Sequence, residues 1–297
     1  MTNEATMTDP EGIARITQRQ ARLLAAALAL ATLGFIGLWS LRAVAAGAFD
    51  LNQFLLALGI GVFAQLVDGA LGMAYGVTAN SLLLSSGLAP AAATATVHVA
   101  EAFTTAASGL SHWKLGNIDK RVFGRIVIPG VIGGVAGVLL IAHVDGRAIR
   151  PWISAYLLAM GLYIIYRAFR SLRAFNIAGP RLTPIAAFGG FADSVGGGGW
   201  GPVVTTTLLG AGHEPRTTIG TVNAAEFFVT LASGFSFALL IGIQTFESVA
   251  GLIVGGLAVA PFAAGLTRRM PRRVAMVGVG LLISGLSLWT ILRALGL

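Results

Sequence analysis

Residues 193–201 read DSVGGGGWG, and they align without a gap with the stretch DGALGMAYG at residues 68–76, which lies 125 positions earlier. The agreement extends much further, from Asp68–Gly109 in the first copy to Asp193–Gly234 in the second. Both copies place acidic residues and glycines within apolar sequence, which is typical of membrane proteins built from two related halves. The sequence therefore predicts an internal structural repeat.

Composition indicates an integral membrane protein. The 297 residues are 56% hydrophobic and 11% charged, which leaves too little polar surface for a soluble globule of this size. The formal net charge of +8 comes mostly from arginines that flank apolar segments, a pattern typical of membrane topology signals rather than of nucleic-acid binding. Because the chain has no cysteine, disulfides, thiolate chemistry and cysteine metal sites are excluded.

Apolar segments of about 20 residues predict about seven full transmembrane helices in an all-α polytopic protein. Residues 1–21 are predicted to form a polar, disordered cytoplasmic arm, and residues 22–297 a single membrane domain. That domain holds an extra first helix at 22–47, a first repeat at 53–170 and a second repeat at 182–297. The predicted spans are Leu23–Leu41, Ala91–Ser111, Val122–Ala142, Ile149–Tyr166, Thr217–Ile241, Val249–Leu266 and Val274–Leu295.

Two further apolar intervals are interrupted by glycine-rich sequence, at Phe54–Ser86 and Pro184–Ala211. Each splits into two halves of about 10 to 15 residues, and at about 1.5 Å rise per residue such halves are too short to cross about 30 Å of hydrocarbon. We therefore predict two re-entrant hairpins of broken helices. Their glycine-rich tips are expected to approach each other near the middle of the membrane.

The placement of basic residues predicts the orientation. If both hairpins turn back and the N-terminus is cytoplasmic, all but four of the 20 lysines and arginines lie on the cytoplasmic side. If both segments crossed instead, the two sides would carry similar numbers, against the positive-inside rule. Each repeat then has three full crossings after its hairpin, so the two halves form an inverted-topology repeat. The C-terminus is expected on the periplasmic or extracellular side of a bacterial inner membrane.

The glycine-rich breaks suit a small anion. Glycine permits tight turns and close backbone approach, and a helix that begins after the break directs free N–H groups and its positive dipole end inward. Tight packing of helices is the alternative role for these glycines. The residues predicted to bind substrate are Gly72, Tyr75, Gly76, Gly197, Gly198, Gly199, Trp200 and Gly201 at the breaks, with Thr105 and Asn223 on the helices that follow.

The helix after each break carries a polar face. Residues 98, 101, 105, 108 and 112 (His, Glu, Thr, Ser and His) follow steps of three and four, which places them on one side of a helix. The second copy repeats the pattern with Asn, Glu, Thr and Ser at 223, 226, 230 and 233. Ionisable groups within the membrane usually face the bundle interior or an aqueous path. The predicted proton or ion coupling residues are Asp68, His98, Glu101, Asp193 and Glu226.

These acidic groups also have a structural interpretation. The glutamates are equally able to hydrogen-bond the free N–H groups of the breaks, and for Asp68 and Asp193 the organisation of a turn is favoured. His98 is either a titrating group or a fixed hydrogen-bond partner, and its counterpart Asn223 cannot take up a proton.

No pattern supports an enzyme or a cofactor. The motifs GxxxxGK[ST], HExxH and GxSxG are absent, and the four histidines form no metal-ligand pattern, so neither a catalytic nor a metal site is predicted. The expected partners are a small anionic substrate and the lipid bilayer, without nucleic acid, and a homo-oligomer is compatible with the sequence. A passive anion channel and a cation-coupled carrier of another small solute are the alternatives to an anion transporter.

The run from Gly196 to Pro202 and the threonine-rich helix after it resemble the TauE/SafE sulfite exporter family. The resemblance covers nearly the whole chain from the first span and is strongest at Gly59–Gly109 and Gly189–Gly234. It implies a transporter with two related halves that exports sulfite, a sulfonate such as sulfoacetate, or a related organic anion. Together with the repeat and the intramembrane acids, this predicts a secondary transporter that works by alternating access, with proton coupling as an option. In the first copy Leu71–Val77 replaces the glycine run that ends in proline, which implies unequal tips.

Overall fold

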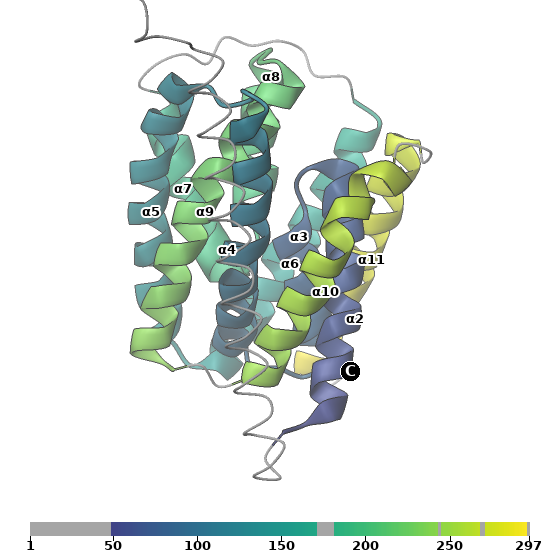
Figure 1. The fold of residues 1–297 in the computed structure, drawn as a ribbon. Helices are drawn as coiled ribbons and strands as arrows, with labels where there is room; N and C mark the ends of the chain where they lie inside the picture. Colours follow the sequence, from purple (N-terminus) through teal and green to yellow (C-terminus); the bar gives the residue numbers. More distant parts are fainter. Residues whose placement is uncertain (1–48, 171–180, 243–244, 268–270, 296–297) are drawn as a thin grey trace, which may run out of the picture. The chain divides into compact units, whose positions relative to one another are not determined.

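The computed structural model describes residues 49–170, 181–242, 245–267 and 271–295, and the elements in these ranges are helical. The predicted arm at 1–21 and the predicted first helix at 22–47 lie outside the described residues. Figure 1 shows the helices in a bundle. The first repeat contains α2 (Leu51–Leu71), α3 (Tyr75–Ser85), α4 (Pro90–Lys114), α5 (Lys120–His143) and α6 (Gly146–Ala168).

The second repeat has the same order of elements. It contains α7 (Leu182–Gly196), the π-helical turn η2 (Gly201–Thr205), α8 (Thr206–Gly210), α9 (Pro215–Leu240), α10 (Phe246–Thr267) and α11 (Arg272–Ala294). Moving the bounds of α4 by 125 positions gives residues 215–239, against 215–240 for α9. The duplication read from the sequence thus extends to the lengths of the helices.

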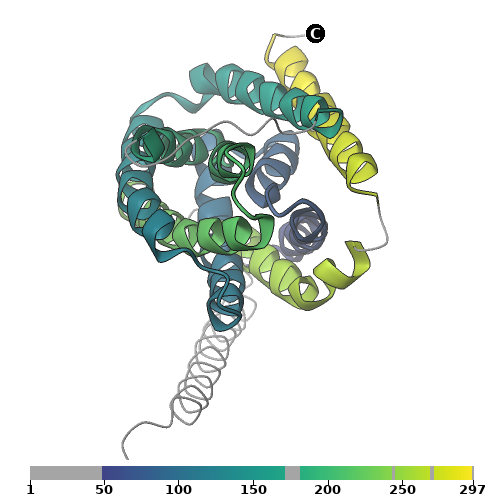
Figure 2. The ribbon, with the colours of Figure 1, turned by 90° about the horizontal axis from the view of Figure 1, so that it is seen from above.

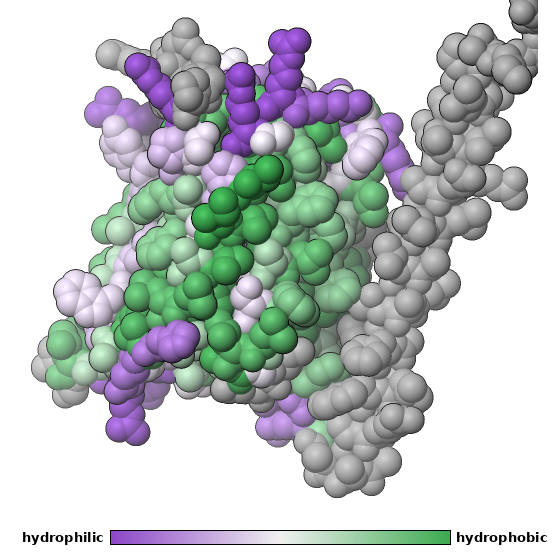
Figure 3. Space-filling view, turned by 90° about the vertical axis from the view of Figure 1, so that its left-hand side faces the viewer, coloured by the Kyte–Doolittle hydropathy of each residue, from purple (hydrophilic) through white to green (hydrophobic). Residues whose placement is uncertain are grey.

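The six predicted spans within the described residues are helices, and their observed ends lie within three residues of the predicted ones. Among the described residues, five helices are long and apolar enough to cross a membrane: α2, α5, α6, α9 and α11. In Figure 3, one face carries a broad belt of hydrophobic side chains with hydrophilic ones toward its upper and lower edges. A surface of this kind fits lipid rather than water.

The breaks are shorter than predicted, because the helices before them run further. Helix α2 has 21 residues instead of about 10 to 15 and is long enough to cross a membrane, so the length argument for re-entry holds only for α7, with 15 residues. Helix α2 begins at Leu51 because the Asp50 side chain accepts hydrogen bonds from the second and third backbone N–H groups that follow it. It also continues through Asp68 to Leu71, and α7 likewise continues through Asp193 to Gly196. Three residues separate α2 from α3, and four separate α7 from η2.

Within the compact unit formed by Asp50–Leu297, the helices pack as a pseudo-two-fold arrangement requires. Helix α2 packs on α10, and its equivalent α7 packs on α5, the equivalent of α10. Equivalent helices also pack directly on each other, α4 with α9 and α6 with α11, and α5 packs on α9 as its equivalent α10 packs on α4. In the view from above, α6 and α11 cross at one side of the bundle (Figure 2).

Equivalent helices run antiparallel where they meet. A Cβ built on Gly109 of α4 would lie 3.1 Å from the Ala224 Cα of α9, and one built on Gly234 of α9 would lie 3.4 Å from the Val99 backbone N of α4. At the offset of 125 positions, Gly234 is the counterpart of Gly109, and Ala224 is the counterpart of Val99. The repeat therefore makes the same contact twice. Helix α4 therefore runs antiparallel to its equivalent α9 where the two helices meet.

Glycines allow the closest of these helix crossings. A Cβ on Gly133 of α5 would overlap the carbonyl oxygen of Ala187 on α7, whereas one on Gly124 of the same helix would meet no atom within 4 Å. We expect Gly133→Ala to lower the free energy of unfolding by about 1–3 kcal/mol through overpacking. Gly124→Ala is the matched control and should be neutral or stabilising by up to about 1 kcal/mol. Equal melting temperatures of the two purified variants would contradict this close packing.

Candidate functional site

Both helix breaks have the same backbone geometry. Gly72 and Gly197 adopt left-handed conformations, with φ of 70° and 66°. Each is a helix C-cap whose N–H donates to a backbone carbonyl, that of Asp68 in the first copy and that of Asp193 in the second. Glycine tolerates this conformation without the steric cost that a Cβ brings. Gly72 and Gly197 therefore end α2 and α7 in equivalent ways.

The aspartate before each break organises the start of the next helical segment. Oδ1 of Asp193 accepts hydrogen bonds from the N–H groups of Gly199 at 2.7 Å and Trp200 at 3.0 Å. In the first copy, Oδ1 of Asp68 accepts from the N–H of Ala74 at 3.1 Å. These bonds satisfy N–H groups that a helix start leaves unpaired. The structure thus contains the turn-organising geometry favoured for both aspartates.

The two breaks meet each other, as the sequence predicts. The side-chain amide of Asn80 on α3 donates to the carbonyl of Gly196 at 2.6 Å. A Cβ on Gly198 would overlap the backbone N of Val77, and one on Gly76 would lie 2.8 Å from the carbonyl oxygen of Gly197. Backbone of one repeat therefore lies against backbone of the other, at positions where only glycine leaves enough room.

A cavity of about 30 Å³ lies beside this contact, with room for about two or three water molecules. Seven of the ten residues predicted to bind substrate line it: Tyr75, Gly76, Thr105, Gly198, Gly199, Gly201 and Asn223. So do four of the five predicted coupling residues: Asp68, Glu101, Asp193 and Glu226. The sequence prediction therefore brings together residues that share one cavity. Their roles in binding and coupling stay predictions.

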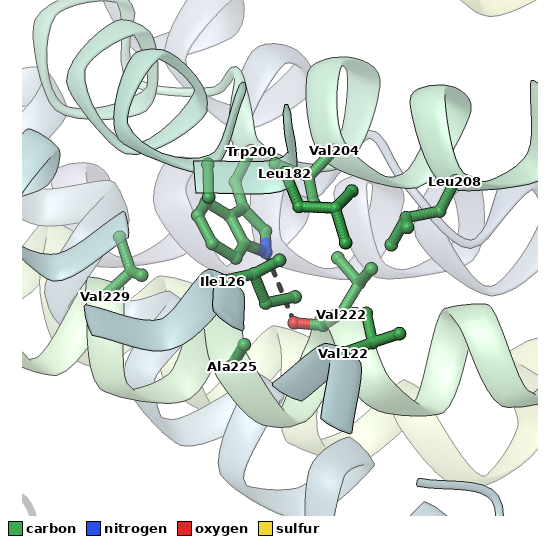
Figure 4. Close-up of a cluster of buried hydrophobic side chains, with 10 residues drawn as sticks. Val122, Ile126, Leu182, Trp200, Val204, Leu208, Val222, Ala225 and Val229 are labelled. Carbon is green, nitrogen blue, oxygen red and sulfur yellow. Dashed lines mark hydrogen bonds between the residues drawn. The ribbon is translucent and has the colours of Figure 1, made fainter. Parts of the chain in front are cut away.

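Trp200, which the sequence predicts in the substrate site, does not line this cavity. Its side chain is fully buried in an apolar cluster with α5 and α9 and does not line the cavity (Figure 4). The indole Nε1 donates to the carbonyl of Val222 at 3.2 Å, and a Cβ on Gly130 of α5 would overlap the ring. An aromatic residue beside glycines is equally suited to a core, and here α5 supplies the space for it.

Three other predicted residues also lie outside the cavity lining. Gly72 faces the side chain of Ile219, and a Cβ on Gly197 would overlap the side chain of Asn80. His98 is fully buried and lies against Asp193 instead, with Nε2 at 3.2 Å from Oδ2. The two glycines shape the breaks and the histidine contacts the aspartate of the opposite repeat, so none of the three touches the cavity directly.

Glu101 connects the polar face of α4 to the first break. The backbone N–H of Gly76 donates to its carboxylate, which is the structural role considered for it. Its Oε2 has no hydrogen-bond partner among the described residues, although the residue is only 3% exposed. An unpartnered oxygen of a buried carboxyl costs free energy unless a proton, water or ligand satisfies it. Glu101 therefore serves the fold with one oxygen and leaves the other available.

The residues on the polar face of α4 lie in different surroundings. Ser108 lines the cavity and accepts a hydrogen bond from the Asn223 side chain at 2.7 Å. His112 lies beyond the predicted span, at the end of α4, where Asn117 donates to its Nδ1 at 3.3 Å. Burial and then the charge of Arg216 lower the pKa of His112. It is a group of the helix end, away from the cavity.

Comparison with known proteins places the chain in a family of membrane transporters. A family model described as sulfite exporter TauE/SafE matches residues 56–289. The chain belongs to this TauE/SafE family. It is 41% identical over 230 residues to the probable membrane transporter protein YtnM of Bacillus subtilis, an alignment that covers 74% of this chain and 77% of the relative. No solved structure matches the chain.

This TauE/SafE protein is accordingly a multi-pass membrane transporter and not an enzyme. Its cavity is strongly acidic. Four carboxyl groups line it, and no lysine, arginine or histidine belongs to the described lining. In the described part of the chain, these carboxyl groups do not converge into a metal-ligand cluster. An anion can occupy such a cavity only if protons or another cation offset the negative charge.

Sequence reasoning missed six residues that line the cavity of this TauE/SafE protein: Gln65, Ala74, Val77, Thr104, Ser108 and Pro202. Two of these residues could have been recognised from the sequence. Gln65 is a polar residue one turn before Asp68 in apolar sequence, and Ser108 belongs to the polar face of α4. The others are apolar or ordinary helix residues, and only the three-dimensional contact of the breaks shows that they face the cavity.

Proposed function

We propose that this protein is a secondary transporter that exports a small anion by alternating access. The observation that carries the proposal is the contact of two helix breaks, one from each repeat, beside a polar cavity lined by four carboxyl groups. The family's description as sulfite exporter supports sulfite, a sulfonate such as sulfoacetate, or a related organic anion. An anion that leaves a cell with a negative interior moves down the electrical gradient, by about 2.3 kcal/mol per charge per 100 mV.

The proposed topology has about seven full transmembrane helices, two re-entrant breaks and two inverted halves in a bacterial inner membrane. The antiparallel contact of α4 and α9 supports the inversion. The first hairpin enters from outside and the second from the cytoplasm, which places the N-terminus inside and the C-terminus outside. Rocking of one half against the other around the shared cavity then opens it to each side in turn.

Because the chain has no cysteine, single introduced cysteines test this topology cleanly. For the first hairpin, we expect Asp50→Cys and Ser86→Cys to react with an impermeant maleimide added to intact cells. For the second hairpin, Arg181→Cys and Ala211→Cys should react only after the membrane is permeabilised. Opposite accessibility of the two ends of one hairpin would show that the segment crosses and does not turn back.

Binding of the substrate class is tested on purified protein by its melting temperature. A ligand that binds only the folded protein stabilises it by about 2.7 kcal/mol at a concentration 100 times its Kd. The panel comprises sulfite, sulfate, thiosulfate, sulfoacetate and short carboxylates at several pH values. We expect at least one sulfur-containing anion to raise the melting temperature, more strongly at lower pH. No response to any anion would contradict the proposal.

The acidic lining favours a second candidate, a cation-coupled carrier of another small solute. Four carboxyl groups without a basic neighbour in the cavity attract cations by simple electrostatics. The same panel separates the candidates if sodium chloride and choline chloride are included at equal ionic strength. Stabilisation by sodium alone would favour the carrier of another solute over the anion exporter.

Glu101 and Glu226 are the cavity carboxyl groups whose protonation the anion proposal most needs. Glu101→Gln and Glu226→Gln preserve size while removing the charge. If either residue takes up the coupling proton, its variant should lose the pH dependence of anion flux in proteoliposomes and approach a constant rate between pH 6 and 8. Thr230→Ser is the control, because it lies on the same helix face as Glu226 and keeps its hydroxyl group. Flux and pH response like those of the unmodified protein in both variants would refute coupling through these residues.

A further inference from the structure

We infer that His98 and Asp193 hold one proton between the two repeats and that this proton moves with the transport cycle. His98 is on α4 of the first repeat, and Asp193 is on α7 of the second. The movement of the proton during transport rests on the proposed function. The presence of the proton is argued from the geometry of the two side chains alone.

The partners of the imidazole determine where its hydrogens lie. Nδ1 of His98 is 2.9 Å from the carbonyl oxygen of Thr94. A carbonyl only accepts hydrogen bonds, so Nδ1 carries a hydrogen and donates it. A neutral imidazole would then present a bare Nε2 to Oδ2 of Asp193 at 3.2 Å. Two lone pairs facing each other at this distance repel.

One proton between Nε2 and Oδ2 removes the conflict. The pair is then an imidazolium with a carboxylate, or an imidazole with a carboxylic acid, and both forms contain the same number of protons. Neither Nε2 nor Oδ2 has another hydrogen-bond partner among the described residues, and both side chains are at most 2% exposed. Among the described residues, no other donor therefore supplies a hydrogen to Nε2 or Oδ2.

The titratable groups around the His98–Asp193 pair do not repel the shared proton. The titratable groups that face Asp193 are Glu101 on α4, Glu226 on α9 and Tyr156 on α6, with Asp68 on α2 interacting with both glutamates. All of them are acidic, and the Tyr156 hydroxyl already donates to the carbonyl of Gly198 at 2.8 Å. A proton at the pair therefore meets no positively charged neighbour among these groups.

The second repeat lacks the equivalent site. The counterpart of His98 is Asn223, whose side-chain amide donates to Ser108 and cannot bind a proton. The counterpart of Asp193 is Asp68, which lines the cavity. The inverted repeat therefore contains a single proton-binding pair of this kind within its described residues, and the proposed stoichiometry is one proton per cycle.

The position of the pair couples the proton to movement. Oδ1 of Asp193 holds the start of the second broken segment, while Oδ2 holds α4 through His98. Moving one repeat relative to the other to open the cavity separates Nε2 from Oδ2. The proton is then no longer shared, and it can leave to the water that enters the cavity. Closure of the two breaks around the next substrate takes a proton up again.

The bound proton is tested without any substrate. The protein labelled with ¹⁵N-histidine is placed in lipid nanodiscs, and the His98 signals are identified by their loss in His98→Asn. We expect Nδ1 to be protonated and Nε2 to be shifted toward its protonated value at pH 7. In Asp193→Asn the Nε2 signal should return to that of a neutral imidazole. A bare Nδ1, or an Nε2 unaffected by Asp193→Asn, would overturn the proton site.

The coupling is tested in proteoliposomes with sulfoacetate, which stays fully ionised between pH 7 and 8. With one proton per anion, a one-unit pH difference at zero membrane potential should change the accumulation ratio about tenfold. In His98→Asn this ratio should fall to about one. His143→Asn is the matched control, because His143 bonds the carbonyl of Leu139 in the same way but is exposed. It should retain the tenfold response.

A tenfold response in His98→Asn would overturn the coupling and leave the proposed function intact. If the unmodified protein moves none of the anions in the binding panel, the proposed function fails and the coupling fails with it. The histidine signals still decide on the proton in that case, so the two failures are distinguishable.

Discussion

Replacement of Asp193 by alanine is expected to lower the free energy of unfolding by about 3–5 kcal/mol, the usual cost of removing one member of a buried ion pair. The substitution leaves His98 buried without its partner and removes the acceptor of the Gly199 and Trp200 N–H groups. The variant should melt far below the unmodified protein in detergent. Asp193→Asn keeps an oxygen for the two N–H groups and should recover part of the loss.

The repeat supplies a matched control in Asp68→Ala. Asp68 accepts a hydrogen bond from Ala74 but is only half-buried, and the described residues offer it no histidine partner. Its loss should cost about 1 kcal/mol, the typical contribution of a hydrogen bond. Equal destabilisation by the two substitutions would mean that the His98 contact contributes nothing. Recovery of stability in a double variant that combines Asp193→Asn with His98→Asn would support it further.

Much of the architecture could be predicted from the repeat, because one offset of 125 positions sets both the order and the bounds of the helices. The positions of the breaks were predictable only approximately. Asp68 and Asp193 look like breaking residues in the sequence, yet both remain helical and reach forward with their side chains. The turn itself forms at Gly72 and Gly197, where a left-handed conformation is required.

The direction of side chains at the breaks could not be predicted from the repeat. Tyr75 and Trp200 are counterparts, but Tyr75 lines the cavity while Trp200 fills the apolar space beside α5. The contact between His98 and Asp193 was equally hidden, because 95 positions separate the two residues and no local pattern joins them. Both features depend on how the repeats pack against each other, which the period of a sequence does not contain.

Gly198→Ala is expected to reduce the rate of anion transport by about tenfold or more. An increase of only about 1.4 kcal/mol in the activation free energy of the rate-limiting step produces that factor. An added Cβ would lie 2.6 Å from the carbonyl carbon of Gly76 and would overlap the backbone N of Val77. Backbone atoms cannot rotate away as a flexible side chain does. The two breaks must therefore separate, and the closed form of the cavity becomes unfavourable.

Gly59→Ala is the matched control for this prediction, because a Cβ on Gly59 of α2 would meet no atom within 4 Å. Efflux of sulfite and of sulfoacetate from proteoliposomes measures the effect for both variants at equal protein content. Gly59→Ala should transport at the unmodified rate and melt at the same or a slightly higher temperature. If Gly198→Ala matched it in both measurements, contact between the two breaks would not be needed for transport. Lower transport with an unchanged melting temperature would instead show that the contact matters in the closed state of the cycle more than in the stability of the fold.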